Sequence, residues 1–334
     1  MAPTSPPPPV PHVALSHVPT PLEPLPRLSA ELGGPAVRVK RDDATGLAIG
    51  GNKVRKLEYL LADAVAGEAD IVVTVGATQS NHCRQTAAAA ARVGLRCELL
   101  LEHRFPDWSE AYNAGGNLQL DHLLGAVVVG HEKGTDMVAA LADRIEALRN
   151  EGHRPYAIPL GGSSVVGAFG YRTAAVELLR QASELGFEPT EIVHATSSGG
   201  TQAGLIAGLA IRRSGVPVLG ISAGGTADYL GPIVRELAEG VIERLGMDRT
   251  FGPDAVRIDD THIGAAYGVP TDAMWEAVEL CAQLEGLLLD PVYSGKAMAG
   301  LIHHIREGRY GADDQVVFIH TGGTPALFAY ANSE

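Results

Sequence analysis

The sequence predicts an α/β protein built on two open, mostly parallel, twisted sheets flanked by helices. From about Ala36 onward, short apolar runs rich in β-branched residues alternate with stretches of helical character. The expected strands are continuously apolar, which is typical of parallel sheets covered by helices on both faces. Because a domain usually takes roughly 100 to 200 residues, a chain of 334 residues with this many strands suggests two sheets rather than one.

The expected strands follow one another along the chain, and each is succeeded by a helical pattern. Helices are expected near Leu118, over 137–148 and over the segment in which Met274, Ala277, Val278, Cys281 and Leu284 recur at helical spacing. Strands are expected at 71–76, 97–102, 126–130, 155–160, 191–196, 217–222, 287–293 and 315–320.

The domain organisation follows from one turn-rich segment and one proline-rich segment. PLGGSSVVGAFG (159–170) is the best internal boundary. We expect a larger domain formed by 18–54 and 166–334, and a smaller α/β domain formed by 55–165. The start of the chain, 1–17, contains a proline run and is expected to be a disordered arm.

Composition and charge exclude several classes of function. The formal charge of −13 argues against nucleic acid or an anionic membrane as a partner. The sequence contains no uninterrupted run of about 18 apolar residues, so no membrane span is predicted. The three widely spaced cysteines form neither a disulfide framework nor a zinc motif, so no metal site is expected and a reducing cytoplasm fits best.

In open α/β sheets, ligands bind beyond the carboxyl ends of the strands, and the junction HATSSGGTQAGL (194–205) lies at such an end. Glycines let backbone N–H groups approach a ligand closely, and a helix N-terminus favours an anion. We interpret the junction as a phosphate cradle, with a plain glycine-rich turn as the alternative. Neither GxGxxG nor a P-loop is present, since SGKAM (294–298) lacks the required spacing. The candidate groups are Ser197, Ser198, Gly199, Gly200 and Thr201.

Two further junctions have polar residues where a helix should begin. In GATQSNHCRQ (76–85), Ser80 and Asn81 suit either helix caps or a small carboxylate site. In HTGGTPALFAY (320–330), Pro325 suits a first helical turn, and a simple corner between strand and helix explains the segment equally well.

The segment GGNKVRKLEYLL (50–61) predicts a helix with Asn52 as its N-cap, yet its first turn carries Lys53, Arg55 and Lys56. The positive end of the helix dipole disfavours cations there; a solvated charged end is the alternative interpretation. The neighbouring cations and the dipole should lower the pKa of Lys53 below its usual value of about 10.4. A lysine of this kind suits Schiff-base chemistry.

A Schiff-base lysine and a separate phosphate cradle are the two anchors that pyridoxal phosphate needs. The order of motifs resembles the family of D-cysteine desulfhydrases and 1-aminocyclopropane-1-carboxylate deaminases from about Pro19 to the C-terminus. This resemblance implies the tryptophan-synthase-β-like fold (fold type II), a cofactor-binding larger domain, a small amino-acid substrate and a cytoplasmic homodimer. The motifs are GGNKVRKLEYL, GATQSNHCRQTAA, PYAIPLGGSS, GGTQAGL, YGVP, EGLLLDPVYSGKAMAGLI and HTGGTPALFAY.

The resemblance also implies roles for the residues at the first two motifs. Lys53 would hold the cofactor covalently and then act on the Cα proton of the substrate. Ser80, with the backbone at Asn81 and His82, would bind the substrate carboxylate. Asn81 would also bond the ring oxygen of the cofactor.

The remaining motifs carry implied cofactor contacts. Tyr293 resembles the aromatic residue that lies against the cofactor, and Tyr267 resembles a second active-site tyrosine. The deaminase pattern has glutamate where this chain has Ser294, and leucine where it has Thr321; both differences resemble the desulfhydrase branch. The implied phosphate loop is Ser198, Gly199, Gly200 and Thr201.

Physical reasoning points in the same direction as these two positions. A hydroxyl at the pyridine nitrogen makes a weaker electron sink than a carboxylate, and thiolate elimination needs less carbanion stabilisation than opening a cyclopropane. We therefore expect D-cysteine to give pyruvate, hydrogen sulfide and ammonia. Sulfite release from L-cysteate is an alternative, because GATQSNH and RDDATGL lean toward a sulfo-lyase branch, although no cationic contact for a sulfonate is identified. The deaminase reaction ranks after it.

An unrelated alternative is a serine hydrolase. GISAG (220–224) matches GxSxG and would make Ser222 the nucleophile. A nucleophile elbow should pass directly into a helix, whereas GGTADY intervenes here, and the hydrolase interpretation leaves Lys53 unexplained.

Overall fold

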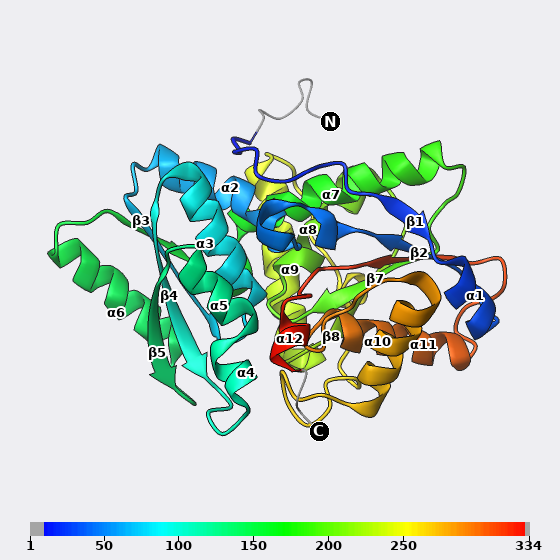
Figure 1. The fold of residues 1–334 in the computed structure, drawn as a ribbon. Coiled ribbons are helices and arrows are strands. Elements are labelled where there is room, and N and C mark those ends of the chain that lie inside the picture. Colours follow the sequence, from blue (N-terminus) through cyan, green and yellow to red (C-terminus); the bar gives the residue numbers. More distant parts are fainter. Residues whose placement is uncertain (1–9, 331–334) are drawn as a thin grey trace.

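The computed structural model describes residues 10–330, and in this range the chain forms two sheets (Figure 1). The larger sheet has the strand order β1-β2-β10-β7-β8-β9, and the smaller has the order β5-β4-β3-β6. All neighbouring strands run parallel except β1, which is antiparallel to β2 at one edge. The predicted fold class is confirmed. The strands are β1 (Leu22–Pro24), β2 (Ala36–Lys40), β3 (Ile71–Ala77), β4 (Arg96–His103), β5 (Val127–Glu132), β6 (Pro155–Ile158), β7 (Glu191–Thr196), β8 (Val218–Ser222), β9 (Arg257–Asp259) and β10 (Gln315–Ile319).

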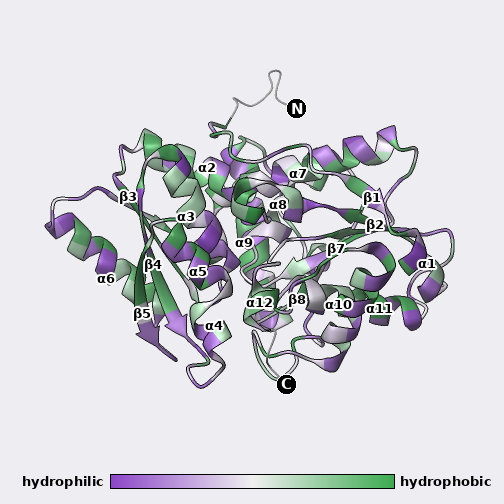
Figure 2. Ribbon diagram, in the orientation of Figure 1, coloured by the Kyte–Doolittle hydropathy of each residue, from purple (hydrophilic) through white to green (hydrophobic). Residues whose placement is uncertain are grey.

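Helices cover both faces of each sheet. In β10, Val317 and Ile319 pack with residues of α7, α8 and α9, while Val316 and Phe318 pack with α1, α10 and α11. The smaller sheet lies between α2 and α3 on one face and α6 on the other, and its strands are largely hydrophobic in Figure 2. The helices are α1 (Pro26–Leu32), α2 (Lys53–Ala66), α3 (Asn81–Val93), α4 (Glu110–Ala114), α5 (Gly116–Leu123), α6 (Met137–Asn150), α7 (Val165–Glu184), α8 (Gly200–Ile211), α9 (Ala227–Arg244), α10 (Asp272–Glu285), α11 (Ser294–Arg306) and α12 (Ala326–Ala329).

The prediction of a strand at 287–293 is wrong. This segment links α10 to α11 and pairs with no strand of the described chain. Leu287 and Leu289 are buried in the core although the segment is a loop. The Asp290 carboxylate accepts hydrogen bonds from the backbone N–H groups of Val292 and Tyr293. The edge strands β1 and β9 were not predicted, since each has only three residues.

Strand register brings the ends of distant strands together. His194 of β7 pairs with Ile319 of β10, so the junctions that follow these strands lie side by side. In the smaller sheet, β3 is central, between β4 and β6, and leads into α3. The carboxyl ends of both sheets are therefore available to form one site, as expected for open α/β sheets.

The beginning of the described chain lies against α2. The backbone N–H groups of Leu15 and Ser16 donate to the Glu58 carboxylate at 3.0 and 2.9 Å, and Val13 N–H donates to the Glu58 carbonyl. Residues 10–17 of the arm predicted to be disordered are thus bound to the body of the protein, and 1–9 lie outside the described residues. The domain boundaries at 54 and 165 stay a prediction. No helix within residues 10–330 has the length and apolar character to span a membrane.

Candidate active site

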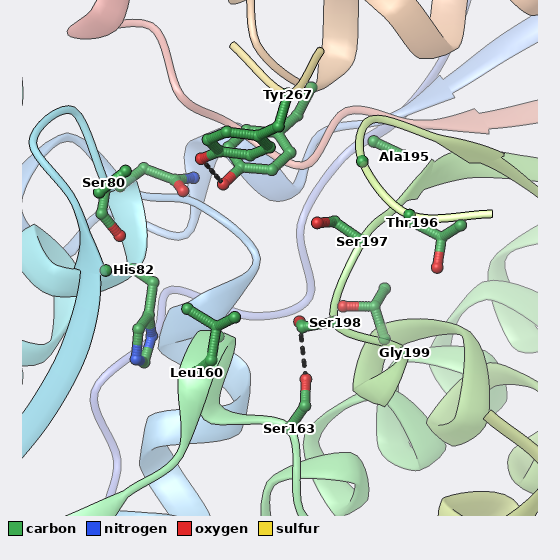
Figure 3. A pocket seen from close by; sticks show the side chains of 18 of the residues that line it. Ser80, His82, Leu160, Ser163, Ala195, Thr196, Ser197, Ser198, Gly199 and Tyr267 are labelled. Atoms are coloured by element: carbon green, nitrogen blue, oxygen red, sulfur yellow. Dashed lines mark hydrogen bonds between the residues drawn. The ribbon is translucent and has the colours of Figure 1, made fainter. Parts of the chain in front are cut away.

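A cavity of about 600 Å³ lies where the junctions after β3, β7, β8 and β10 converge (Figure 3). Ser80 and His82 stand on one side of it in Figure 3, and Ser197 and Ser198 stand opposite. Two residues predicted for the site, Gly200 and Ser294, are not part of the wall. The predicted residues that line the cavity are Lys53, Ser80, Asn81, His82, Ser197, Ser198, Gly199, Thr201, Tyr267, Tyr293 and Thr321.

Lys53 is brought into the cavity by a turn that only glycine permits. Gly51 has φ of 129°, and a Cβ there would lie 2.5 Å from the Gln85 side chain. Asn52 N–H donates to the Thr321 carbonyl at 2.9 Å, which fixes the start of α2 against the junction after β10. Asn52 occupies the N-cap position, but its side chain makes no capping bond; its amide donates to Thr201 Oγ1 at 3.1 Å.

Burial, opposed by the charge of Asp290, lowers the pKa of Lys53 to about 8. The direction agrees with the sequence prediction, but the cause differs. Arg55 points away from the cavity, and its guanidinium is paired with Asp42 and Glu177. Desolvation therefore makes Lys53 a neutral amine more readily than an exposed lysine, without help from Arg55.

The start of α3 presents free backbone N–H groups to the cavity. Ser80 is the N-cap, and its hydroxyl accepts from Cys83 N–H at 3.2 Å. The backbone N–H groups of Asn81 and His82 have no partner within residues 10–330. Burial and then Lys53 and Lys56 hold the pKa of His82 well below its ordinary value, so its ring is neutral. The two free N–H groups at this helix N-terminus suit a small carboxylate.

The glycine-rich junction after β7 forms a cradle that a second loop covers. Gly199 has φ of 82° and precedes α8, whose first N–H, that of Gly200, donates to Ser163 Oγ at 3.1 Å. Ser163 Oγ–H donates to Ser198 Oγ at 2.8 Å. Lys56 reaches the same loop and donates to the Gly161 carbonyl at 3.0 Å. The segment therefore combines hydroxyls and a helix N-terminus with a buried lysine behind it, whose pKa is held well below its ordinary value by burial and by Lys53.

The backbone of Gly161 passes close to both the cradle and the lysine. A methyl group at Gly161 would lie 2.3 Å from Ser198 Oγ and 3.6 Å from Lys53 Cε. Gly161 has φ of 65°, which disfavours other residues. The turn at 160–162 thus leaves room for a ligand that reaches from Lys53 to the cradle.

Two tyrosines and an arginine close another side of the cavity. The hydroxyls of Tyr267 and Tyr293 are 2.5 Å apart, and the Arg104 guanidinium lies 4.7 Å from the centroid of the Tyr267 ring. Burial raises the pKa of both tyrosines, so their hydroxyls are protonated at neutral pH. Lys53 Nζ lies 6.0 Å from the centroid of the Tyr293 ring.

Asp290, which the sequence prediction missed, fixes the segment that carries Tyr293. Its carboxylate accepts from the N–H groups of Val292, Tyr293 and Ser294 at 2.7 to 2.9 Å. The Ser294 hydroxyl donates to the same carboxylate at 2.6 Å, which explains why Ser294 lies behind the wall. Thr321 does reach the cavity.

Ser222, the nucleophile of the hydrolase alternative, does not line the cavity. It is fully buried, and its hydroxyl donates to the Gly225 carbonyl at 2.7 Å. No histidine among the described residues bonds this hydroxyl, so it lacks the base that a serine nucleophile requires.

The comparisons with known proteins agree with this geometry. Residues 13–322 match the family described as "Pyridoxal-phosphate dependent enzyme". The chain belongs to this family. D-cysteine desulfhydrases of Salmonella choleraesuis (strain SC-B67) and Salmonella typhi are each 46% identical to it over 323 residues, which is 96% of either chain. A crystal structure of an ACC deaminase homologue matches with a TM-score of 0.87 and 37% identity, over 97% of this chain and 95% of that one. Family and cofactor are as predicted.

The residues of the cavity fit pyridoxal phosphate. The cofactor needs an amine for its aldehyde and N–H and hydroxyl donors for its phosphate, and the cavity offers Lys53 and the cradle on either side of Gly161. Sequence reasoning missed Arg104, Ser163 and Asp290 as parts of this site. Ser163 stood within a quoted motif, PLGGSS, but nothing local to Arg104 signals that its side chain meets Tyr267.

Proposed function

We propose that this protein is a D-cysteine desulfhydrase, which converts D-cysteine to pyruvate, hydrogen sulfide and ammonia. The proposal is supported by the identity to the Salmonella enzymes and by one feature of the cavity. Within residues 10–330, no aspartate or glutamate lines the cavity. A site without a carboxylate favours a weak electron sink, which suffices for expelling a thiolate and disfavours ring opening of a cyclopropane.

The cofactor, when bound, supplies an electron sink for the electrons of the Cα–H bond. Lys53 is the residue we assign to its aldehyde and, once free, to the Cα proton, because its amine has a pKa of about 8. The cradle is assigned to its phosphate. Asn81 is assigned to the cofactor ring, since its side-chain amide bonds no described residue, and Thr321 to a further cofactor contact. The cradle residues are Ser198, Gly199, Gly200 and Thr201.

Substrate binding and release of sulfur are assigned to opposite walls. Ser80 and the N–H groups of Asn81 and His82 would bind the carboxylate at the start of α3. Tyr267 and Tyr293 keep their protons at neutral pH and can donate a hydrogen bond to the departing sulfur. Ser294 acts indirectly in this assignment, since its hydroxyl is taken by Asp290.

The test is a product assay of the holoenzyme on D-cysteine, L-cysteate and 1-aminocyclopropane-1-carboxylate, scoring sulfide, sulfite and 2-oxobutyrate. Sulfide from D-cysteine should dominate, and Lys53→Ala should be colourless and inactive. Borohydride reduction should abolish the visible absorption of the wild type and leave the reduced cofactor attached covalently to Lys53. Dominant 2-oxobutyrate release, or a wild type that binds no pyridoxal phosphate, would refute the proposal.

Release of sulfite from L-cysteate is a second candidate, which one observation favours. Arg104 lines the cavity with a side chain 32% exposed. Its Nε–H donates to the Glu102 carboxylate at 2.6 Å, and neither Nη atom has a hydrogen-bond acceptor within residues 10–330. A guanidinium with free donors can bind a sulfonate in a bidentate manner. Dominant sulfite release in the same assay would select this candidate.

We also infer a cytoplasmic homodimer. The described cysteines, Cys83, Cys97 and Cys281, are buried and unpaired, which supports a reducing compartment. Light scattering coupled to gel filtration measures the oligomer, and a monomer at micromolar concentration would contradict the dimer. Cell fractionation with a cytoplasmic marker tests the location.

A further inference from the structure

Lys296 is a buried lysine that the proposed mechanism does not use. It belongs to the motif SGKAM, lies in the first turn of α11 and is fully buried. The positive end of the helix dipole disfavours a cation at this position, and within residues 10–330 it forms no salt bridge with a carboxylate. A lysine placed at this cost to the helix needs another explanation.

The ammonium of Lys296 binds two backbone carbonyls of one neighbouring segment. Its Nζ donates to the carbonyl of Ile263 at 2.5 Å and to that of Ala266 at 3.1 Å. Burial lowers the pKa of Lys296 to about 8, with Asp290 opposing, so the group is mainly charged at pH 7. Hydrogen bonds from a charged donor are roughly twice as strong as neutral ones.

The segment that Lys296 holds is part of the cavity wall. Residues 260–268 form neither helix nor strand, so their backbone has few bonds of its own. Ile263, Ala266 and Tyr267 all line the cavity. The Tyr330 hydroxyl donates to the Gly268 carbonyl at 2.8 Å and holds the far end of the segment.

A second contact joins the same segment to the same helix. Nε2 of His304, also on α11, lies 2.9 Å from the carboxylate of Asp259, the last residue of β9, which immediately precedes the segment. Tyr293 immediately precedes α11. One helix therefore carries one tyrosine of the pair at its start and holds the segment that carries the other.

We propose that Lys296 is a positioning residue that fixes Tyr267 against Tyr293 by holding the carbonyls of Ile263 and Ala266. Lys296 touches neither substrate nor cofactor in this role; it acts through the backbone that leads into Tyr267, at Ile263 and Ala266. The kinetic consequence rests on the proposed function, in which the two tyrosines face the substrate. The structural consequence, an ordered segment 260–268, does not depend on it.

The first test measures backbone hydrogen exchange in the holoenzyme. Lys296→Met removes the donor and keeps an unbranched apolar chain, and exchange at 261–268 should become at least about 10-fold faster, since the carbonyl bonds are lost. Lys296→Gln should restore part of the protection. The control is Lys40→Met, which removes another buried lysine that donates to a backbone carbonyl, that of Thr20; Lys40 also pairs with Glu177, so this variant shows how far loss of a buried lysine away from the cavity speeds exchange at 261–268. Unchanged exchange at 261–268 in Lys296→Met overturns the proposal.

The second test is a kinetic cycle on D-cysteine with Lys296→Met, Tyr267→Phe and the double variant. Misplacement of a contact group costs up to about 100-fold in rate, so kcat of Lys296→Met should fall about 10- to 100-fold while the cofactor absorption remains. The double variant should be within about 2-fold of the slower single variant, because both changes act on one group. If the fold-losses in kcat of the two single variants multiply in the double variant, the changes act independently and the proposal is overturned.

The two proposals fail in different ways. A wild type that releases no sulfide, with faster exchange in Lys296→Met, overturns the proposed function and leaves the positioning role intact. If Lys296→Met does not fold, the same exchange measurement and cycle are run with Lys296→Leu, which also removes the donor, and wild-type exchange together with wild-type kcat overturns the positioning role.

Discussion

Lys53 and Arg55 are two residues apart at the start of α2, yet their side chains enter different environments. Lys53 enters the cavity, whereas Arg55 is buried among carboxylates, with Nη2 2.9 Å from both Asp42 and Glu177. Burial alone would raise the pKa of Asp42, but Arg55 and Lys40 hold it below its ordinary value. Arg55 therefore anchors α2 to α7 and to the turn after β2, and leaves Lys53 to the ligand.

The first prediction concerns Arg55→Met. Removing one partner of a buried ion pair leaves an uncompensated charge, so the free energy of unfolding at pH 7 should fall by about 3 to 5 kcal/mol. The pKa of Asp42 is depressed in the folded state, so this stabilisation is present above about pH 4 and is lost as the pH falls further. Urea unfolding at several pH values should show that the difference in free energy of unfolding between variant and wild type becomes smaller as the pH falls.

The same variant separates stability from chemistry. The rate at which apoprotein takes up pyridoxal phosphate should rise with pH through about 8 in both proteins, because burial and not Arg55 sets the pKa of Lys53. A midpoint that moves toward 10.4 in Arg55→Met would contradict this account.

At the scale of elements, the turn between β6 and α7 decides how well the cradle receives a phosphate. Lys56 on α2 holds the Gly161 carbonyl, and Ser163 holds both Ser198 and the first N–H of α8. Three elements from different parts of the chain thus meet at one turn. A small change in this turn should alter cofactor binding more than overall stability.

The second prediction uses two glycines with similar backbones. Gly161→Ala places a methyl group 2.3 Å from Ser198 Oγ, whereas Gly152, with φ of 88°, has no atom within 4 Å of the added methyl group. Both variants pay roughly 1 to 2 kcal/mol for positive φ. Only Gly161→Ala should weaken pyridoxal phosphate binding, by about 10- to 100-fold if one charge-assisted hydrogen bond is lost. Absorption titrations of the apoproteins measure this, and equal affinities would show that the turn does not shape the cradle.

At the scale of the whole molecule, the cofactor site joins both sheets. Its wall combines the junction after β3 in the smaller sheet with those after β7 and β10 in the larger one. A ligand that contacts both parts binds the folded state and not the unfolded chain, so it must stabilise the fold.

The third prediction is therefore a loss of stability on removing the cofactor. At a free concentration of 100 times Kd, the ligand adds about 2.7 kcal/mol to the free energy of unfolding. The midpoint temperature of thermal unfolding of the wild type should rise as pyridoxal phosphate is titrated, and that of Lys53→Ala should rise less at each concentration. A midpoint independent of the cofactor would mean that the site does not couple the two sheets.

Much of the fold was predictable because parallel strands and amphipathic helices leave local patterns. The runs at 71–76 and 191–196 are apolar on both faces, and β3 and β7 are found there. The run at 287–293 also begins with apolar residues, but Asp290 and Pro291 interrupt it, and it lies in the core as a loop. An apolar run predicts that a segment is buried, but the segment forms a strand only if its backbone pairs with a neighbouring strand.

Local residue patterns are enough to predict the alternation of strands and helices, the glycine-rich cradle, and a lysine at a helix start where helix stability does not explain it. The partners of each polar side chain depend instead on how the chain packs. Arg55 reaches Glu177, which is 122 residues away in sequence, and Lys296 reaches Ile263, 33 residues away. The physical reason is range: periodicity and turn chemistry act over a few residues, whereas the partners of a buried charge depend on how distant elements pack.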